Sequence, residues 1–271
     1  MFAPLLQNLR DRRPLVHAIT NYVTANDCAN LLLACGASPI MADEPEEAPE
    51  ITARAAGLVL NLGTLRRTTI PALLACGRTA NARGIPVVLD PVGVGASCFR
   101  RDTALRLLRE VRFTVIRGNL SEMETLARGQ SGAPGVDSTD RVTPDNLDAC
   151  CALVRDFARR TGAVVAMSGA VDLVSDGDKV FCIRNGHPMM GLVTGTGCQL
   201  SCLAGAFAAA NPGQPLEAAA AAVCAMGLCG EIAHARLGPL DGSGSLRTYL
   251  LDAVCRLTPD QLEKGARYAL R

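Results

Sequence analysis

The sequence has few aromatic side chains and almost no imbalance of charge. Its 271 residues include no tryptophan, three tyrosines and six phenylalanines, so packing must depend on aliphatic and alanine-rich contacts. The 27 basic and 26 acidic side chains give a formal net charge of +1, and no long run of one sign occurs. Because nucleic-acid-binding proteins favour a basic stripe, we do not expect nucleic acid to be a partner.

Signals for membranes and export are also missing. No apolar run approaches the roughly 20 residues of a membrane span. Charged and polar residues near the N-terminus interrupt any signal-peptide core. We therefore expect no membrane partner and a cytoplasmic location.

The cysteines show no metal-binding pattern. The sequence has 12 of them without a Cys-x-x-Cys pair, and it has only three histidines, so a structural zinc site is not expected. Most of the cysteines lie among Ala, Leu and Val, where a thiol packs as a small apolar group. We expect these thiols to be reduced, as in the cytosol.

Short apolar runs alternate with helical patterns along the chain. Strands are predicted at 38–41, 57–61, 85–90, 113–117 and 163–168, with a hairpin from 172–175 and 179–183. Helices are predicted at 24–35, 46–55, 70–82, 101–110, 121–128 and 144–160, with a loop at 129–142 and a mostly helical segment after 197. This alternation predicts one α/β domain over residues 1–271, with a mainly parallel central sheet and helices on both faces.

Polar residues end four of the predicted strands. They are Asn61, Asp90, Arg117 and Ser168. Ligands of open α/β sheets bind at the carboxyl ends of the strands. The sequence therefore predicts a site at this edge of the sheet.

The run Gly195-Thr196-Gly197-Cys198 is followed by apolar residues at helical spacing. A glycine-rich turn that leads into a helix presents unpaired backbone N–H groups and the positive end of the helix dipole. Together these features bind an anion, most often phosphate. The alternative is a glycine turn in front of a buried helix.

Three charged residues have two interpretations each. Asp90, beside glycines at a strand end, could bind Mg²⁺ or cap the following turn. Glu122 could hold a metal-bound water or complete a capping box. Arg117 could pair with phosphate oxygens or form a surface salt bridge. One Arg, two acids and a glycine-rich helix start are what phosphoryl transfer requires, because that reaction depends on positioning and on neutralising spread negative charge.

Cys198 lies at the predicted helix N-terminus, where the pKa of its thiol should fall. An enzyme with a nucleophilic cysteine is therefore an alternative, and a small side chain that lines a pocket is another. Near the N-terminus, Asn21 lies in a polar turn, and Asn26 and Asn30 share a helix face; these amides could bind a ligand or tie loops together. Met41 follows a short strand, where methionine is more often core than ligand contact.

Several long strings, in the same order, resemble the hydroxyethylthiazole kinase family of thiamine biosynthesis and salvage, which is part of the ribokinase-like group. They cover residues 14 to 210 and read ITNYV (19–23), GASPIMA (36–42), VLNLGTL (59–65), LDPVGVGAS (89–97), VIRGN (115–119), GVDS (135–138), NGHP (185–188) and VTGTGC (193–198). The resemblance implies a ribokinase-like fold and ATP-dependent phosphorylation of the primary alcohol of 4-methyl-5-(2-hydroxyethyl)thiazole. It also implies Mg²⁺ and a homotrimer with active sites between subunits.

The resemblance also implies roles for single residues. Met41 and Gly195 match the family's thiazole contacts, and Asn21 and Asn26 are nearby candidates for substrate binding. The run from Gly195 to Cys198, with Thr196 and Gly197, resembles the catalytic anion hole; the related sugar kinases usually carry Asp in place of the cysteine.

The nucleotide and metal positions follow in the same way. Arg117 and Ser168 match the family's ATP-binding positions. Asp90 and Glu122 match its acidic positions near the metal and the phosphates.

Departures from the family pattern concern substrate preference more than reaction type. Ser168 stands where Thr is common, and Leu120 where Ala is usual. Asp27 replaces a residue that is often apolar, and Asp43 and Glu44 make the loop after Met41 acidic. A kinase for a pyrimidine alcohol and a catalytically silent ligand sensor remain as alternatives, and the intact acidic residues argue against the sensor.

Overall fold

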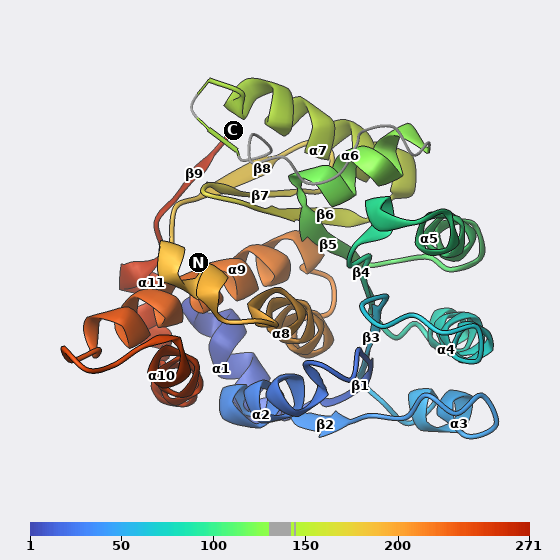
Figure 1. Cartoon of the computed structure of the whole chain (residues 1–271), viewed down its shortest axis with the longest axis horizontal. Coiled ribbons are helices and arrows are strands. Elements are labelled where there is room, and N and C mark those ends of the chain that lie inside the picture. The colour runs from blue at the N-terminus through green and yellow to red at the C-terminus, as the bar shows by residue number, and fades with distance from the viewer. Residues whose placement is uncertain (130–141, 144) are drawn as a thin grey trace.

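The computed structural model describes residues 1–129, 142–143 and 145–271. Within these residues one nine-stranded sheet, in the order β2-β1-β3-β4-β5-β6-β7-β8-β9, separates two layers of helices (Figure 1). The strands are β1 (Leu15–Ile19), β2 (Ser38–Ile40), β3 (Gly57–Asn61), β4 (Val87–Asp90), β5 (Val115–Asn119), β6 (Val164–Ser168), β7 (Asp172–Ser175), β8 (Val180–Ile183) and β9 (Tyr268–Leu270).

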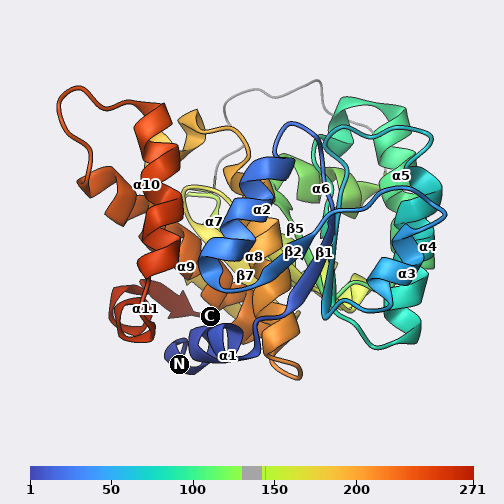
Figure 2. The same ribbon diagram turned by 90° about the horizontal axis from the view of Figure 1, so that it is seen from below.

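Helices fill most of the intervals between the strands. They are α1 (Ala3–Arg12), α2 (Ala25–Cys35), α3 (Ala48–Thr52), α4 (Ile70–Ala82), α5 (Cys98–Glu110), α6 (Leu120–Arg128), α7 (Leu147–Thr161), α8 (Thr196–Ala210), α9 (Pro215–Ala235), α10 (Ser243–Arg256) and α11 (Pro259–Gly265), with short 3₁₀ turns at Val94–Ala96 and Pro188–Leu192. Figures 1 and 2 show α3, α4 and α5 on one face of the sheet and α2, α8 and α9 on the other, with α10 outside α2 and α9.

The first six strands of the sheet, β2 to β6 in spatial order, pair in parallel, and β7, β8 and β9 continue it antiparallel. Along β3 and β4, Leu58, Leu60 and Leu89 belong to one core, whereas Val59 and Val88 belong to the core on the opposite face. A strand that is apolar on both faces must be covered on both. The predicted α/β fold with a mainly parallel, doubly covered sheet is therefore confirmed.

Some element boundaries differ from the predicted ones. The strand predicted at 113–117 begins at Val115 and runs to Asn119, so Arg117 lies two residues before the strand end. The helix predicted at 101–110 begins at Cys98, because the Ser97 hydroxyl caps it by accepting from the Arg100 amide. The helix predicted at 46–55 covers only Ala48–Thr52.

Three elements near the chain ends were not predicted: α1, β1 and β9. The helix predicted from 144 begins at Leu147. The loop predicted at 129–142 and the GVDS string lie almost wholly outside the described residues.

Helix α9 has 21 residues and is apolar enough to cross a membrane by length and composition, although no membrane-length apolar run was expected. Inside the protein, 78% of its most apolar window is buried. Its apolar side chains already pack against other elements, so α9 is a core helix of the kind that passes the same length and composition test.

Helix α8 lies close to the sheet because glycines meet at the contact. A Cβ added at Gly205 would lie 2.8 Å from Cγ2 of Val59, and one at Gly57 would lie 3.1 Å from the Gly205 carbonyl oxygen. This close approach fixes the height of the α8 N-terminus over the carboxyl ends of β3 and β4.

We predict that Gly205→Ala destabilises the protein by about 1–3 kcal/mol, because the added methyl overpacks the contact with Val59. The control is Gly244→Ala on α10, where an added Cβ meets no atom within 4 Å. The control should be neutral or stabilising by up to about 1 kcal/mol, because Ala lowers the conformational entropy of the unfolded chain relative to Gly. Urea unfolding of both variants measures the difference, and equal free energies of unfolding would contradict the close contact.

Candidate functional site

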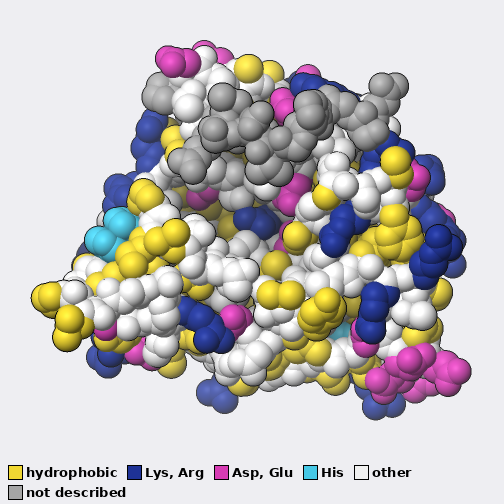
Figure 3. Space-filling model, viewed as in Figure 1, with side chains coloured by type: hydrophobic (Ala, Val, Ile, Leu, Met, Phe, Trp, Pro, Cys, Tyr) yellow, Lys and Arg dark blue, Asp and Glu magenta, His cyan; other side chains and the backbone are white. Residues whose placement is uncertain are grey.

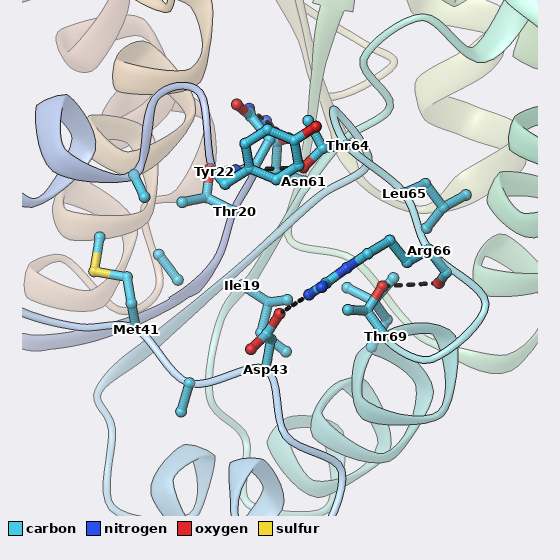
Figure 4. Close-up of a pocket in the computed structure, with 15 residues that line it drawn as sticks. Ile19, Thr20, Tyr22, Met41, Asp43, Asn61, Thr64, Leu65, Arg66 and Thr69 are labelled. Carbon is cyan, nitrogen blue, oxygen red and sulfur yellow. Dashed lines mark hydrogen bonds and ion pairs between the residues drawn. The ribbon is translucent and has the colours of Figure 1, made fainter.

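A cavity of about 190 Å³ lies where the chain changes direction across the sheet. From β1 the chain first moves outward to β2 and then returns past β1 to β3, so the loops after β1 and β3 diverge at this point. Open α/β sheets bind ligands at such a switch point. The lining includes residues from the loops after β1, β2 and β3: Ile19, Thr20, Asn21, Tyr22, Met41, Asp43, Asn61, Thr64, Leu65, Arg66 and Thr69 (Figure 4).

A second cavity, of about 460 Å³, lies beside the first at the carboxyl end of the sheet. Arg117 and Ser168 come from β5 and β6, Thr196 and Gly197 from the start of α8, and apolar residues of α9 complete the wall. Figure 3 shows one face of the molecule hollowed near its centre, with acidic and basic side chains beside the hollow.

Asn61, Asp90 and Cys198 connect the wall of the first cavity to that of the second. Asn61 and Asp90 are direct partners in the β3–β4 register, and Asn61 Nδ2 donates to Asp90 Oδ2 at 2.7 Å. The same Nδ2 lies 3.3 Å from Cys198 Sγ, and Asn21 Nδ2 lies 3.2 Å from that sulfur. The structure thus brings Asn21, Asp90 and Cys198 together as predicted candidates and adds Asn61 between them.

Asp90 is fully buried and held by groups from three elements. Besides Asn61 on β3, the hydroxyl of Ser201 on α8 donates to Oδ2 at 2.8 Å, and Nη1 of Arg117 on β5 lies 3.9 Å from Oδ1. Oδ1 accepts no hydrogen bond from the described residues. Burial raises the pKa of the Asp90 carboxyl, and the charge of Arg117 and these hydrogen bonds oppose the rise.

Arg117 joins Asp90 to the second cavity. Its Nη2 donates to the Ser168 hydroxyl at 2.7 Å, so the two predicted ATP-binding residues contact each other. A Cβ at Gly197 would overlap the Arg117 guanidinium. Gly197 therefore leaves room for the Arg117 guanidinium in its observed position, and a larger residue there would displace that side chain.

Gly195 is the N-cap residue that directly precedes α8. Its φ of 87° is in the left-handed region that favours glycine, and an added Cβ would lie 2.5 Å from Cγ2 of Thr24. The first amides of α8, at Thr196, Gly197 and Cys198, have no acceptor within the helix. These free amides leave the predicted anion site possible, and Gly195 lies against Thr24, whose amide donates to Asn21 Oδ1 just before α2.

Glu122 forms the capping box of α6, which was the structural alternative. Its Oε1 accepts from the Gly93 amide at 2.9 Å and its Oε2 from the Asn119 amide at 2.8 Å, while Asn119 caps the Glu122 amide. Burial, and then the negative charge of Asp90, raise the pKa of Glu122. Glu122 therefore caps a helix, and the charge of Asp90 also disfavours ionisation of its carboxyl group.

The expectation of a lowered pKa for Cys198 is wrong. Burial raises the pKa of this thiol, and the nearby charge of Asp90 raises it further. Both effects outweigh the hydrogen bonds of Thr24 and Asn61, which lower this pKa. Cys198 is a buried thiol that lines neither cavity and contacts Asn21 and Asn61 behind the first one, and this favours a packing role over the nucleophile.

The structure places the two remaining predicted substrate contacts, Met41 and Asn26, in different surroundings. Met41 lines the first cavity, whereas Asn26 is exposed, lines neither cavity and accepts from Asn30 at 3.1 Å. The acidic loop after Met41 lines the first cavity, where Arg66 Nη2 donates to Asp43 Oδ2 at 2.9 Å (Figure 4). Asp27 is buried and paired with Arg247 on α10, which explains how an acid replaces an apolar residue there.

Sequence reasoning missed several residues of the site. Ser201 could have been found from its helical spacing after Gly197 and Cys198 on α8. Asp172 gave no signal: it lines the second cavity at the start of β7, and its Oδ1 accepts from the Gly169 amide at 2.8 Å. Burial raises the pKa of Asp172 to about 7.

Asp90 and Glu122 are suited to a divalent cation. Among the described residues no group of three or more His, Cys, Asp or Glu side chains could hold a metal ion. However, Mg²⁺ is usually bound by one or two carboxylates, with water and phosphate oxygens completing its shell. Two buried acids match that donor set: Asp90 Oδ1 accepts no hydrogen bond from the described residues, and burial, followed by the charge of Asp90, raises the pKa of Glu122.

The chain is similar to known proteins over nearly its whole length. The family model described as "Hydroxyethylthiazole kinase family" matches residues 6–260. The hydroxyethylthiazole kinase of Clostridium acetobutylicum is 52% identical over 270 residues, which cover 99% of each chain. The solved structure of a hydroxyethylthiazole kinase protein from Pyrococcus horikoshii OT3 superposes with a TM-score of 0.89 at 36% identity, covering 100% of this chain and 98% of that one.

Similarity to a more distant solved structure supports the fold alone. A ribokinase-like superfamily protein from Enterococcus faecalis V583 superposes with a TM-score of 0.58 at 15% identity, over 92% of this chain and 89% of that one. The ribokinase-like fold that the resemblance implies is confirmed.

We predict that Cys198 reacts slowly with iodoacetamide at neutral pH, because its thiol is buried and its pKa is raised. Peptide mass spectrometry after timed labelling measures each cysteine separately, and the exposed Cys98 and Cys255 are internal controls. Labelling of Cys198 faster than Cys98 in the native protein would contradict the buried thiol and revive the nucleophilic cysteine enzyme.

Proposed function

The chain belongs to the hydroxyethylthiazole kinase family, and we propose that it transfers the terminal phosphoryl group of ATP to the hydroxyl of 4-methyl-5-(2-hydroxyethyl)thiazole, a step of thiamine biosynthesis. The observation that carries the proposal is the pair of adjoining cavities. Both are partly apolar; the second is larger, and its lining includes Arg117, Ser168 and the residues that start α8. Two substrates can therefore approach one set of residues from opposite sides.

The first cavity takes the thiazole alcohol. Met41 and aliphatic side chains from the loop after β3 provide an apolar surface for the ring. The buried amides of Asn21 and Asn61 lie at the end nearest Cys198 and the start of α8. We assign the hydroxyl to this end, with Gly195 beside it, and we do not assign a contact to Asn26.

The second cavity takes ATP. Arg117 and Ser168 bind phosphate oxygens, and the amides at Thr196, Gly197 and Cys198 stabilise the negative charge that spreads over the moving phosphoryl group. Asp90 and Glu122 would hold Mg²⁺, which when bound neutralises phosphate charge. Because the transition state of phosphoryl transfer is loose, the acceptor proton leaves late and little help from a base is needed.

Asp90 acts in this scheme by charge and position. It orients Asn61 on one side and Arg117 on the other, so the two substrates are held relative to the same carboxylate. Cys198 shapes the wall between the cavities.

We predict that Asp90→Ala loses most of the activity, at least about 10²-fold in kcat, because positioning errors of this kind are costly. Cys198→Ala should retain measurable turnover, and the control Cys229→Ala, which removes a buried thiol on α9, should be close to wild type. Release of ADP is measured with hydroxyethylthiazole, with a pyrimidine alcohol and with neither. The reverse ranking of Asp90→Ala and Cys198→Ala would overturn these roles.

The same assay separates the alternative functions. ADP release that depends on the pyrimidine alcohol would indicate the related kinase. Ligand binding without ADP release would indicate a sensor. Turnover that is abolished by Cys198→Ala and is indifferent to ATP would indicate a cysteine nucleophile.

We also propose that residues 1–271 form one kinase domain in the cytoplasm and assemble as a homotrimer with the site at the subunit interface. One sheet takes strands from both ends of the chain, β1 and β9, and the cysteines carry no disulfide. Tyr22, which lines the first cavity, is 76% exposed, and the adjacent Val23 is 58% exposed. Exposed apolar side chains next to a site favour a protein partner.

Sedimentation equilibrium tests the assembly. We expect a mass three times the 28.3 kDa of one chain. A mass of one chain at the concentrations used for activity would contradict the trimer but not the kinase.

A further inference from the structure

Arg100 stands in an unusual place for a cation. It lies in the first turn of α5, one turn after the capping hydroxyl of Ser97. Positive charge is disfavoured at this end of a helix because the dipole is positive there. A residue that opposes a local preference is expected to have a compensating interaction elsewhere.

The compensating interactions are with two loops of the site. Nη1 of Arg100 donates to the carbonyl oxygens of Leu62 and of Val92, the latter at 2.8 Å, and Nη2 donates to the carbonyl oxygen of Gly63. Leu62 and Gly63 directly follow β3, and Val92 follows β4. One half-buried guanidinium therefore ties together the loops that begin at Asn61 and Asp90.

These loops continue directly into the wall between the cavities. The Gly63 amide donates to Asn61 Oδ1 at 2.8 Å, and Asn61 Nδ2 donates to Asp90 Oδ2 at 2.7 Å. The Leu62 amide donates to the Asp90 carbonyl oxygen at 3.0 Å. The position of the Gly63 peptide thus determines which way the Asn61 amide faces.

Gly63 is also closely packed on its other side. A Cβ built there would lie 2.6 Å from Nδ2 of Asn21, the second amide that contacts Cys198. A shift of the loop would therefore move both amides of the first cavity. The same loop has a second contact with α5, because the Arg67 guanidinium lies 5.8 Å from the centre of the Phe99 ring.

We propose that Arg100 is a positioning residue for phosphoryl transfer: it clamps the loops after β3 and β4 and so orients Asn61 and Asp90 toward the two substrates. This role rests on the proposed kinase function. It requires the planar, five-donor guanidinium, because a single ammonium group cannot bridge three carbonyl oxygens with the same geometry. Arg100 lines neither cavity and does not touch a substrate in this scheme.

The test compares Arg100→Met and Arg100→Lys with Arg106→Met. Arg106 lies on the same helix, is 50% exposed and, within the part of the chain that the structure describes, forms a surface ion pair with Glu110, so its variant controls for loss of a cation from α5. We expect kcat of Arg100→Met to fall by about 10- to 100-fold with the KM for ATP little changed, and Arg100→Lys to recover a part of the loss. Unchanged kcat in folded Arg100→Met, or an equal loss in Arg106→Met, would overturn the clamp.

Hydrogen exchange of the unliganded protein gives a readout that does not depend on activity. We expect faster exchange in peptides covering 58–66 and 90–96 of Arg100→Met, and no change there in Arg106→Met. Faster exchange spread evenly over the chain would indicate a general loss of stability and would overturn the positioning role. If the wild-type protein released no ADP with the thiazole alcohol, the proposed function would fail while the exchange measurement still decided whether Arg100 holds these loops.

Discussion

A single buried carboxylate constrains the arrangement of this site. Asp90 has no exposed surface, and removing a carboxylate from water costs several kcal/mol unless hydrogen bonds and opposite charge compensate. The compensation comes from Asn61 on β3, Ser201 on α8 and Arg117 on β5. Because each partner belongs to a different element, keeping one charge solvated by protein groups fixes two strands and a helix relative to each other.

The same network links residues of the two cavities. Asn61 connects Asp90 to Cys198, and Arg117 connects Asp90 to Gly197 at the start of α8. In the proposed function, the phosphoryl donor and the acceptor alcohol meet at the start of α8, where helix amides can receive negative charge. In this scheme Cys198 contributes shape and two hydrogen-bond contacts, and its raised pKa keeps it a thiol.

Much of the fold could be predicted from the sequence because its strands are apolar on both faces and its helices are bounded by clear signals. β3 and α4 match their predicted limits at 57–61 and 70–82. β1 was missed because a five-residue strand directly before a polar turn has no flanking pattern of its own, and β9 because it is three exposed residues long that depend on pairing with β8. Such pairing joins residues that are far apart in the sequence, so the local sequence pattern does not indicate it.

Within the site, strand-end polarity identified Asn61 and Asp90 correctly as neighbours, since parallel strands in register must end side by side. The sequence could not show that Arg117 reaches Asp90 and Ser168 from a position inside β5, nor that Arg100 lies under the loops. The prediction of a lowered pKa for Cys198 was wrong for a related reason. The position of Cys198 at a helix start can be read from the sequence, whereas its burial and its proximity to Asp90 cannot.

The most direct test of the central claim is a crystal structure with a non-hydrolysable ATP analogue and hydroxyethylthiazole bound together. We expect the thiazole ring beside Met41 with its hydroxyl directed toward Asn61 and Cys198, and the terminal phosphate at the amides that start α8, close to Arg117. Either ligand bound away from these residues, or the two reactive groups held apart on different surfaces, would contradict it.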